Sequence, residues 1–216
     1  EASQIRVADA IGAMGRASSV VVVGDSKQMP PSSFGEASTS DDADSDATAS
    51  ESLTDAESIL SECLSAAVPQ QWLSWHYRSQ DESLIAFSNL HYYEGRLSSF
   101  PAPGLGVGGG HSDRGLSLVR VGGVFERSGK GKTLRTNRKE AEAIVEEIRR
   151  RFEASPEAVP SIGVVTFNQQ QRAFIEALIR DGGDTRIIEA LDSTQEEGLF
   201  IKNLENVQGD ERDVIL

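Results

Sequence analysis

The stretch that decides the expected fold is Val20-Val-Val-Val23-Gly24-Asp25-Ser26-Lys27-Gln28-Met29-Pro30-Pro31. Four β-branched residues in a row are typical of a strand buried on both faces, as in a parallel sheet. The run ends at Gly24 and Asp25, so a small residue and a carboxylate follow the strand at the edge where open α/β sheets bind their ligands. The simpler alternative is an ordinary turn after a buried strand, because Gly and Asp are common turn residues.

The rest of the chain alternates between helical and strand patterns. Apolar residues recur at helical spacing in five segments, and β-branched or apolar runs suggest three further strands before the apolar segments that close the chain. This alternation predicts an α/β fold with a parallel sheet flanked by helices. The expected helices are 5–17, 55–67, 80–92, 137–152 and 169–179, and the expected strands are 71–76, 116–121 and 161–166.

Composition restricts the class of protein. The chain has 216 residues, which is room for one large domain or for one domain and part of another. A single cysteine, Cys63, excludes an internal disulfide framework and favours a reducing, cytoplasmic location. No apolar run approaches the roughly 20 residues that span a bilayer, so no membrane partner is expected.

The net charge of −13 argues against nucleic-acid binding by bulk attraction, but the charge is unevenly distributed. Residues 36–57 carry eight acidic and no basic side chains. The segment 36–54 has too few bulky apolar residues to offset the entropy of ordering it, and it is therefore expected to be a disordered acidic linker. Its aspartates lack the glycine and terminal glutamate of a calcium loop, so no metal site is expected there.

Several segments, in the right order, resemble the motifs of superfamily 1 helicases. The pattern Gly24-Asp25-x-x-Gln28-x-x-Pro31 resembles motif III, and Tyr77-Arg78-Ser79 resembles motif IV. Ile162-Gly-Val-Val-Thr166-Phe-Asn168 is similar to the strand and turn that precede motif V. Gln208-Gly209-Asp210-Glu211-Arg212-Asp213 resembles motif V of the branch that contains the RNA-decay helicases, with large bacterial members as the expected relatives. Glu1-Ala-Ser-Gln4 resembles the tail of a Walker B motif.

This resemblance implies a domain organisation. Residues 55–216 would form a RecA-like domain of the P-loop NTPase type, the second motor domain, ending before motif VI. Residues 1–35 would be a remnant of the first motor domain, joined through the linker 36–54. The parent protein would use ATP and Mg²⁺ to move along single-stranded DNA or RNA, with the missing first motor domain as a partner. The fragment alone would be inactive and would bind no cofactor tightly.

The resemblance also implies roles for individual residues. Glu1 would orient or deprotonate the attacking water, Gln28 would sense the γ-phosphate, and Arg78 would act as an arginine finger that faces Gln28 across the nucleotide cleft. Tyr77 would stack on adenine, and Glu211 would contact the ribose. The remaining implied nucleotide-binding residues are Gln4, Gly24, Asp25, Gln208 and Gly209, and the implied nucleic-acid-binding residues are Thr166, Asn168 and Asn203; no metal ligand is implied.

Each role has a simpler alternative. Arg78 could pair with a surface acid, Tyr77 could cover the core, and Thr166 could be a helix N-cap. Trp72 and Trp75 are expected in the core rather than as base-stacking platforms. For the whole protein, the alternative to a motor is a non-catalytic module, derived from a helicase domain, that binds nucleic acid or another protein.

Overall fold

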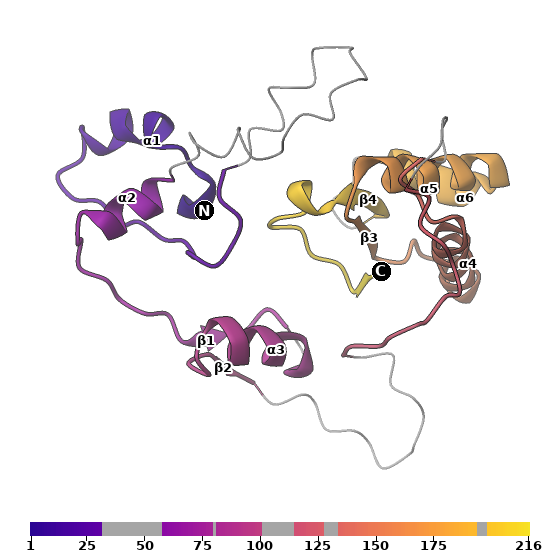
Figure 1. Ribbon diagram of the computed structural model, residues 1–216, viewed down its shortest axis with the longest axis horizontal. Helices are drawn as coiled ribbons and strands as arrows, with labels where there is room; N and C mark the ends of the chain where they lie inside the picture. The colour runs from indigo at the N-terminus through magenta and orange to yellow at the C-terminus, as the bar shows by residue number, and fades with distance from the viewer. Residues whose placement is uncertain (32–57, 80, 101–114, 128–133, 194–197) are drawn as a thin grey trace. The chain divides into compact units, whose positions relative to one another are not determined.

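A computed structural model describes residues 1–31, 58–79, 81–100, 115–127, 134–193 and 198–216. The chain divides into two compact units, Glu1–Leu118 and Val119–Leu216 (Figure 1). The acidic segment 36–54 lies outside the described residues, as do the boundaries expected at residues 35 and 54. The predicted division into a remnant, a linker and a second motor domain therefore remains a prediction.

The first unit contains short helices and one small parallel sheet. Its two strands run parallel, with Trp75 beside Ser98 and His76 beside Ser99, and the helix α3 connects them. The helix predicted over 80–92 is confirmed as α3, and those predicted over 5–17 and 55–67 are present in shorter form. The elements are η1 (Ala2–Gln4), α1 (Val7–Met14), α2 (Ile59–Ser65), β1 (Trp75–His76), α3 (Ser83–Tyr92) and β2 (Ser98–Ser99).

Two predicted strands are wrong. Val20–Val23 belongs to no strand, and Val21 is 87% exposed instead of buried on both faces. The backbone N–H of Ala2 donates a hydrogen bond to the carbonyl of Val23, at the end of this segment. The segment 116–121 is likewise outside any strand, and Leu118 is exposed. High β-propensity makes a strand only where a ladder partner exists.

The second unit is an α/β structure with a parallel sheet. The strand order is β4-β3-β5, and both neighbours run parallel to β3. The strand predicted over 161–166 and the helices predicted over 137–152 and 169–179 are confirmed, whereas α6 was not predicted. The elements are α4 (Arg138–Ala154), β3 (Ile162–Thr166), α5 (Gln169–Gly182), α6 (Thr185–Asp192), β4 (Phe200–Asn203), η5 (Leu204–Asn206) and β5 (Val214–Ile215).

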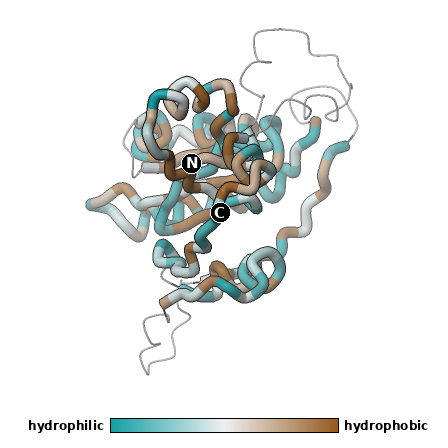
Figure 2. The backbone as a smooth tube through the Cα atoms, turned by 90° about the vertical axis from the view of Figure 1, so that its left-hand side faces the viewer, coloured by the Kyte–Doolittle hydropathy of each residue, from teal (hydrophilic) through white to brown (hydrophobic). Residues whose placement is uncertain are grey.

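Successive residues of β3 face opposite sides of the sheet. Ile162 and Val164 are fully buried and join a core with residues of α4, α5 and α6, which lie on the same side of β3 and β4 (Figure 1). Gly163 points to the opposite face, where a Cβ atom would come within 2.9 Å of Cε1 of Phe200. Hydrophobic and hydrophilic residues alternate along the helices (Figure 2), as expected for helices that bury one side. The predicted fold class, a parallel α/β sheet flanked by helices, is confirmed.

A buried amide ties the starts of α4 and α5 together. Asn137, the N-cap of α4, accepts a hydrogen bond from the backbone N–H of Glu140. Its own backbone N–H donates to Oε1 of Gln171 at 2.8 Å, and its carbonyl accepts from Nε2 of Gln171 at 3.1 Å. Both residues are buried. One side chain therefore satisfies both backbone groups of a buried capping residue.

Replacing Gln171 with leucine should therefore destabilise the second unit. The change leaves the buried N–H of Asn137 without its partner, at a cost of about 1–3 kcal/mol, whereas the carbonyl of Asn137 keeps the bond from the N–H of Ala141. We expect the free energy of unfolding, measured by urea titration with far-UV circular dichroism, to fall by about 1–3 kcal/mol. Gln170→Leu, at an exposed neighbouring position of α5, is the control and should change it by less than about 0.5 kcal/mol. Equal stability of the two variants would contradict this assignment.

Candidate functional site

The Walker-B-like residues pack directly against the motif-III-like segment in the first unit. The backbone N–H of Ala2 donates to the carbonyl of Val23 at 2.9 Å, and both Ala2 and Ser3 are buried. A Cβ atom at Gly24 would lie 3.0 Å from the backbone nitrogen of Ser3 and 3.1 Å from Cδ2 of Leu60. Glycine is thus the residue that lets these segments approach. Glu1 and Asp25 are brought to the same part of the unit.

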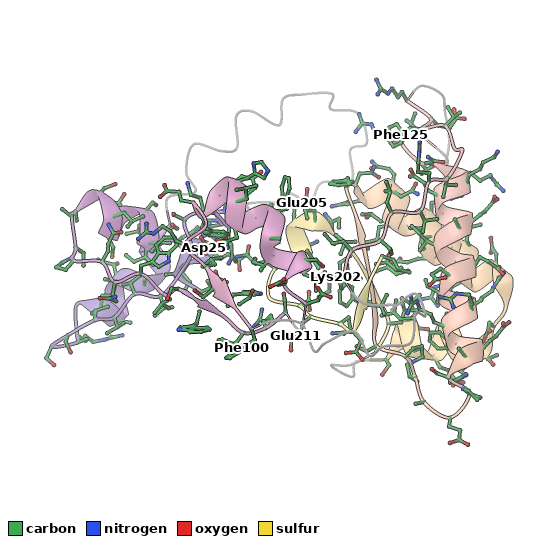
Figure 3. The ribbon with its side chains drawn as sticks, turned by 90° about the horizontal axis from the view of Figure 1, so that it is seen from below. Asp25, Phe100, Phe125, Lys202, Glu205 and Glu211 are labelled. Atoms are coloured by element: carbon green, nitrogen blue, oxygen red, sulfur yellow. The ribbon has the colours of Figure 1, made fainter. Side chains whose placement is uncertain are left out.

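Asp25 organises the turn that follows Gly24 (Figure 3). Its Oδ1 accepts a hydrogen bond from the backbone N–H of Lys27 at 2.9 Å, and its Oδ2 accepts one from Nε2 of Gln28 at 3.1 Å. The backbone N–H of Gln28 also donates to the carbonyl of Asp25. This arrangement is an Asx turn, in which the carboxylate replaces a backbone acceptor. The spacing Gly24-Asp25-x-x-Gln28 thus has a local physical basis: the carboxylate holds the glutamine.

Tyr93 also contacts Asp25 and was missed by the sequence analysis. Its hydroxyl donates to Oδ2 of Asp25 at 2.6 Å. Burial raises the pKa of the Tyr93 hydroxyl, and the hydrogen bond to Asp25 and the negative charges of Asp25 and Glu1 raise it further. The hydroxyl therefore stays protonated and donates at neutral pH. No pattern marked it, because the contact joins residues that are 68 positions apart.

The motif-IV-like residues lie at the tip of a turn. The side chain of Ser79 contacts Nε2 of His76 at 2.9 Å, and the backbone N–H of Ser79 donates to the same nitrogen at 3.3 Å. The turn closed by these contacts carries Tyr77 and Arg78, both of which are exposed, Tyr77 by 80%. The alternative in which Tyr77 covers the core is therefore wrong. An exposed phenol and an exposed guanidinium stand next to each other in the sequence.

The expectation that both tryptophans belong to the core is wrong as well. Trp72 is 42% exposed and Trp75 is 63% exposed. Trp75 stacks on Phe100, with ring centroids 5.3 Å apart, and Trp72 packs edge-on against Tyr93 with Arg96 over its ring. The two-residue strands β1 and β2 are too short to bury side chains of this size.

In the second unit, the three residues implied in nucleic-acid binding lie at one edge of the sheet. Thr166 and Asn203 end β3 and β4 and are register partners. Both are buried, at 5% and 4% exposed, and the Thr166 hydroxyl donates to the carbonyl of Asn168 at 3.0 Å. Asn168 caps α5 by accepting from the backbone N–H of Gln171 at 2.7 Å. The N-cap is therefore Asn168, and the alternative that assigned this role to Thr166 is wrong.

The motif-V-like residues lie along the path from β4 to β5. Gly209 has a φ of +87°, in the left-handed region that favours glycine, next to a turn in which the N–H of Asp210 donates to the carbonyl of Val207. Asp210 forms an ion pair at 2.6 Å with Lys202, which is labelled in Figure 3. Arg212 then donates to the carbonyl of Gly198, just before β4. The segment thus runs from the carboxyl edge of the sheet back to the amino edge, and Glu211 is exposed.

The donor set for a metal is incomplete. Within the described residues, His, Cys, Asp and Glu side chains form no group of three or more that could hold a metal ion.

No helix in the described parts of the chain is long and apolar enough to cross a membrane.

Comparison with known proteins identifies the family. Residues 56–216 match a family described as an AAA domain, which is about three quarters of the chain. The chain belongs to this family. It is 30% identical over 224 aligned residues to a Mycoplasma genitalium protein named uncharacterized ATP-dependent helicase MG140, and equally identical to the homologue of that protein in Mycoplasma pneumoniae. Both alignments cover 100% of this chain and 19% of the relative.

The family match confirms the resemblance to a helicase-type domain that the motifs indicated. The chain spans about a fifth of the length of these relatives. Their named activity is therefore that of much longer proteins.

Proposed function

We propose that this chain is part of an ATP-dependent superfamily 1 helicase or translocase that acts on single-stranded DNA or RNA. In this proposal, residues 55–216 supply the second half of the ATP site and part of the nucleic-acid groove. Residues 1–35 are a remnant of the first motor domain and supply one wall of the nucleotide site. The observation that carries the proposal is the packing of Ala2 and Ser3 against Val23 and Gly24, which gathers Glu1, Asp25 and Gln28 in one unit.

The chemistry of this group suits phosphoryl transfer. ATP hydrolysis needs a positioned water, an acceptor for its proton and positive charge near the γ-phosphate. Glu1 carries an exposed carboxylate for the water, and the amide of Gln28, held by Asp25, can contact the γ-phosphate. Gln4 and Gly24 support these residues, since η1 and the close approach at Gly24 fix the backbone around them.

Tyr77 and Arg78 provide the contribution of the second motor domain. An exposed aromatic ring can stack on adenine, and a guanidinium fork matches two phosphate oxygens. The turn closed by His76 and Ser79 presents both groups outward. Gln208, Gly209 and Glu211, in the second unit, are further proposed nucleotide-binding residues, with Glu211 proposed for the ribose. ATP and Mg²⁺ are proposed for the longer parent protein.

The proposed nucleic-acid contact lies at the carboxyl edge of the sheet in the second unit. The side chains of Thr166, Asn168 and Asn203 all make hydrogen bonds within the unit. We therefore propose that these three side chains fix the backbone conformation at this edge. The peptide groups of the edge and the N-terminus of α5 would then bind the phosphates of the single-stranded nucleic acid.

An ATPase assay on the longer parent protein tests the proposal. We expect hydrolysis of ATP that increases several-fold when a single-stranded oligonucleotide is added, and comparing oligo(dT) with oligo(U) separates DNA from RNA as the substrate. The 216-residue chain alone should show no activity above background, since its sequence contains no G-x-x-x-x-G-K-[ST] phosphate-binding loop. A parent protein that binds oligonucleotides without hydrolysing ATP would favour the non-catalytic module instead.

A further inference from the structure

Tyr93 lies outside every helicase-like motif of this sequence, yet it contacts one of them. It follows the last residue of α3, and its hydroxyl donates to Oδ2 of Asp25 at 2.6 Å. An O–H···O⁻ bond of this length is charge-assisted and therefore stronger than one between neutral groups. It joins residue 25, in the motif-III-like turn, to residue 93, in the part of the chain that matches the AAA domain family.

The loop that carries Tyr93 is held in place by Asn89. The Asn89 side chain donates to the carbonyl of Leu97 at 2.9 Å and accepts from the N–H of Leu97 at 3.0 Å. The Asn89 carbonyl also accepts a bond from the N–H of Gly95, which has a φ of +69°. The ring of Trp72 packs edge-on against Tyr93 with centroids 6.4 Å apart. Tyr93 therefore comes from a turn fixed on several sides.

The acceptor of this bond is the same atom that holds Gln28. Oδ2 of Asp25 accepts from both Tyr93 and Nε2 of Gln28, while Oδ1 accepts from the backbone N–H of Lys27. Among the described residues, the other hydrogen bonds that this carboxylate accepts come from Lys27 and Gln28 of its own turn. The bond from Tyr93 is therefore the one among them that ties the carboxylate to a different segment of the chain.

We propose that Tyr93 is a positioning residue that acts on ATP hydrolysis through Asp25 and Gln28. Its hydroxyl fixes the carboxylate of Asp25, and the fixed carboxylate holds the Gln28 amide in the orientation that meets the γ-phosphate. This inference rests on the proposed function, because it gives Gln28 its role there. The bond also ties the position of Gln28 to the start of the AAA-type region, so a movement of the Tyr93 loop would reach the nucleotide through Gln28.

Steady-state ATPase kinetics of the full-length parent protein test this inference. Tyr93→Phe removes the hydroxyl and keeps the ring against Trp72. We expect it to lower kcat by about tenfold with KM for ATP within about twofold, since one hydrogen bond to a charged group is lost and nucleotide contacts stay. In a Gln28→Ala background, Tyr93→Phe should lower kcat by less than about twofold further, because the proposed effect of the hydroxyl passes through the Gln28 amide. Tyr92→Phe, at the exposed neighbouring tyrosine, is the matched control and should leave kcat unchanged.

The other outcomes overturn the inference. Wild-type kinetics in Tyr93→Phe would show that the hydroxyl does not position Gln28. If the kcat of the double variant falls by the product of the two single fold-changes, Tyr93 has a role independent of Gln28. If Tyr93→Phe fails to fold, Asp25→Asn replaces it and should give the same fall in kcat, with wild-type kcat in Asp25→Asn overturning the inference. A wild-type parent without ATPase activity would instead refute the proposed function itself, and this inference with it.

Discussion

Replacing Arg78 with alanine in the full-length parent protein is expected to lower kcat for ATP hydrolysis by about 10³-fold or more. An arginine finger stabilises charge that accumulates on the transferred phosphoryl group, and alanine removes both the charge and the planar fork. The exposed position of Arg78 in the turn closed by His76 and Ser79 leaves the side chain at the surface of its unit. Because an exposed turn residue contributes little to folding, the loss should appear in kcat while the melting temperature stays close to that of the wild type.

Two further variants make this result specific. Arg78→Lys keeps the charge but loses the bidentate geometry, so its kcat should lie between those of alanine and wild type. Arg16→Ala removes an exposed arginine from the same unit and should leave kcat unchanged. A kcat for Arg78→Ala within a few-fold of wild type would remove the finger role and support the simpler alternative of a surface ion pair.

The second large effect is expected on stability, from Gly163→Val in β3. A Cβ atom at this position would lie 2.8 Å from Cδ1 of Ile215 and 2.9 Å from Cε1 of Phe200. The Phe200 ring cannot move away freely, because Arg212 and Lys202 lie over it. Overpacking of this kind costs about 1–3 kcal/mol or more. We expect a loss of at least about 3 kcal/mol in the free energy of unfolding, measured by denaturant titration of the 216-residue chain.

A control and a compensating change identify the cause. Gly122→Val adds the same atoms where nothing lies within 4 Å of the new Cβ, so it should cost much less. Combining Gly163→Val with Phe200→Ala removes the ring that the valine meets, and the pair should be more stable than the sum of the two single changes. If the two losses simply add, contact with Phe200 is not the reason for the glycine.

The elements that the sequence predicted best are those whose contacts are local or repeat along one face. The helix predicted over 137–152 became α4, because its apolar residues face one core and Asn137 caps its start. The sequence analysis assigned no element to the short helix α6, although Asp184 caps it and Ile187 is fully buried. Val20–Val23 had the strongest strand pattern and formed none, since strand formation depends on a partner that no local pattern reveals.

The residues of the candidate site also differ in whether their contacts are local in the sequence or depend on the tertiary fold. The turn from Gly24 to Gln28 could be predicted from the sequence, because Asp25 accepts hydrogen bonds from residues two and three positions away. The role of Tyr93 could not be predicted from the sequence, because its hydrogen bond to Asp25 depends on the tertiary fold. Thr166 was correctly placed at a strand end, but its hydroxyl turned out to face its own backbone. Sequence patterns therefore located the motifs, whereas the structure shows which of their side chains make hydrogen bonds within the protein.

The bond pattern between Gln171 and Asn137 also constrains how the sequence can vary. Gln171 binds only the backbone N–H and C=O of residue 137, whereas the Asn137 side chain serves a separate purpose as the cap of α4. Position 137 could therefore accept Ser, Thr or Asp during evolution without any change at position 171. Position 171, in contrast, needs a side chain with both a donor and an acceptor at the reach of glutamine. Although residues 137 and 171 are in direct contact, their identities would therefore vary independently during evolution. Position 171 would stay glutamine, whereas position 137 would vary among residues that cap helices.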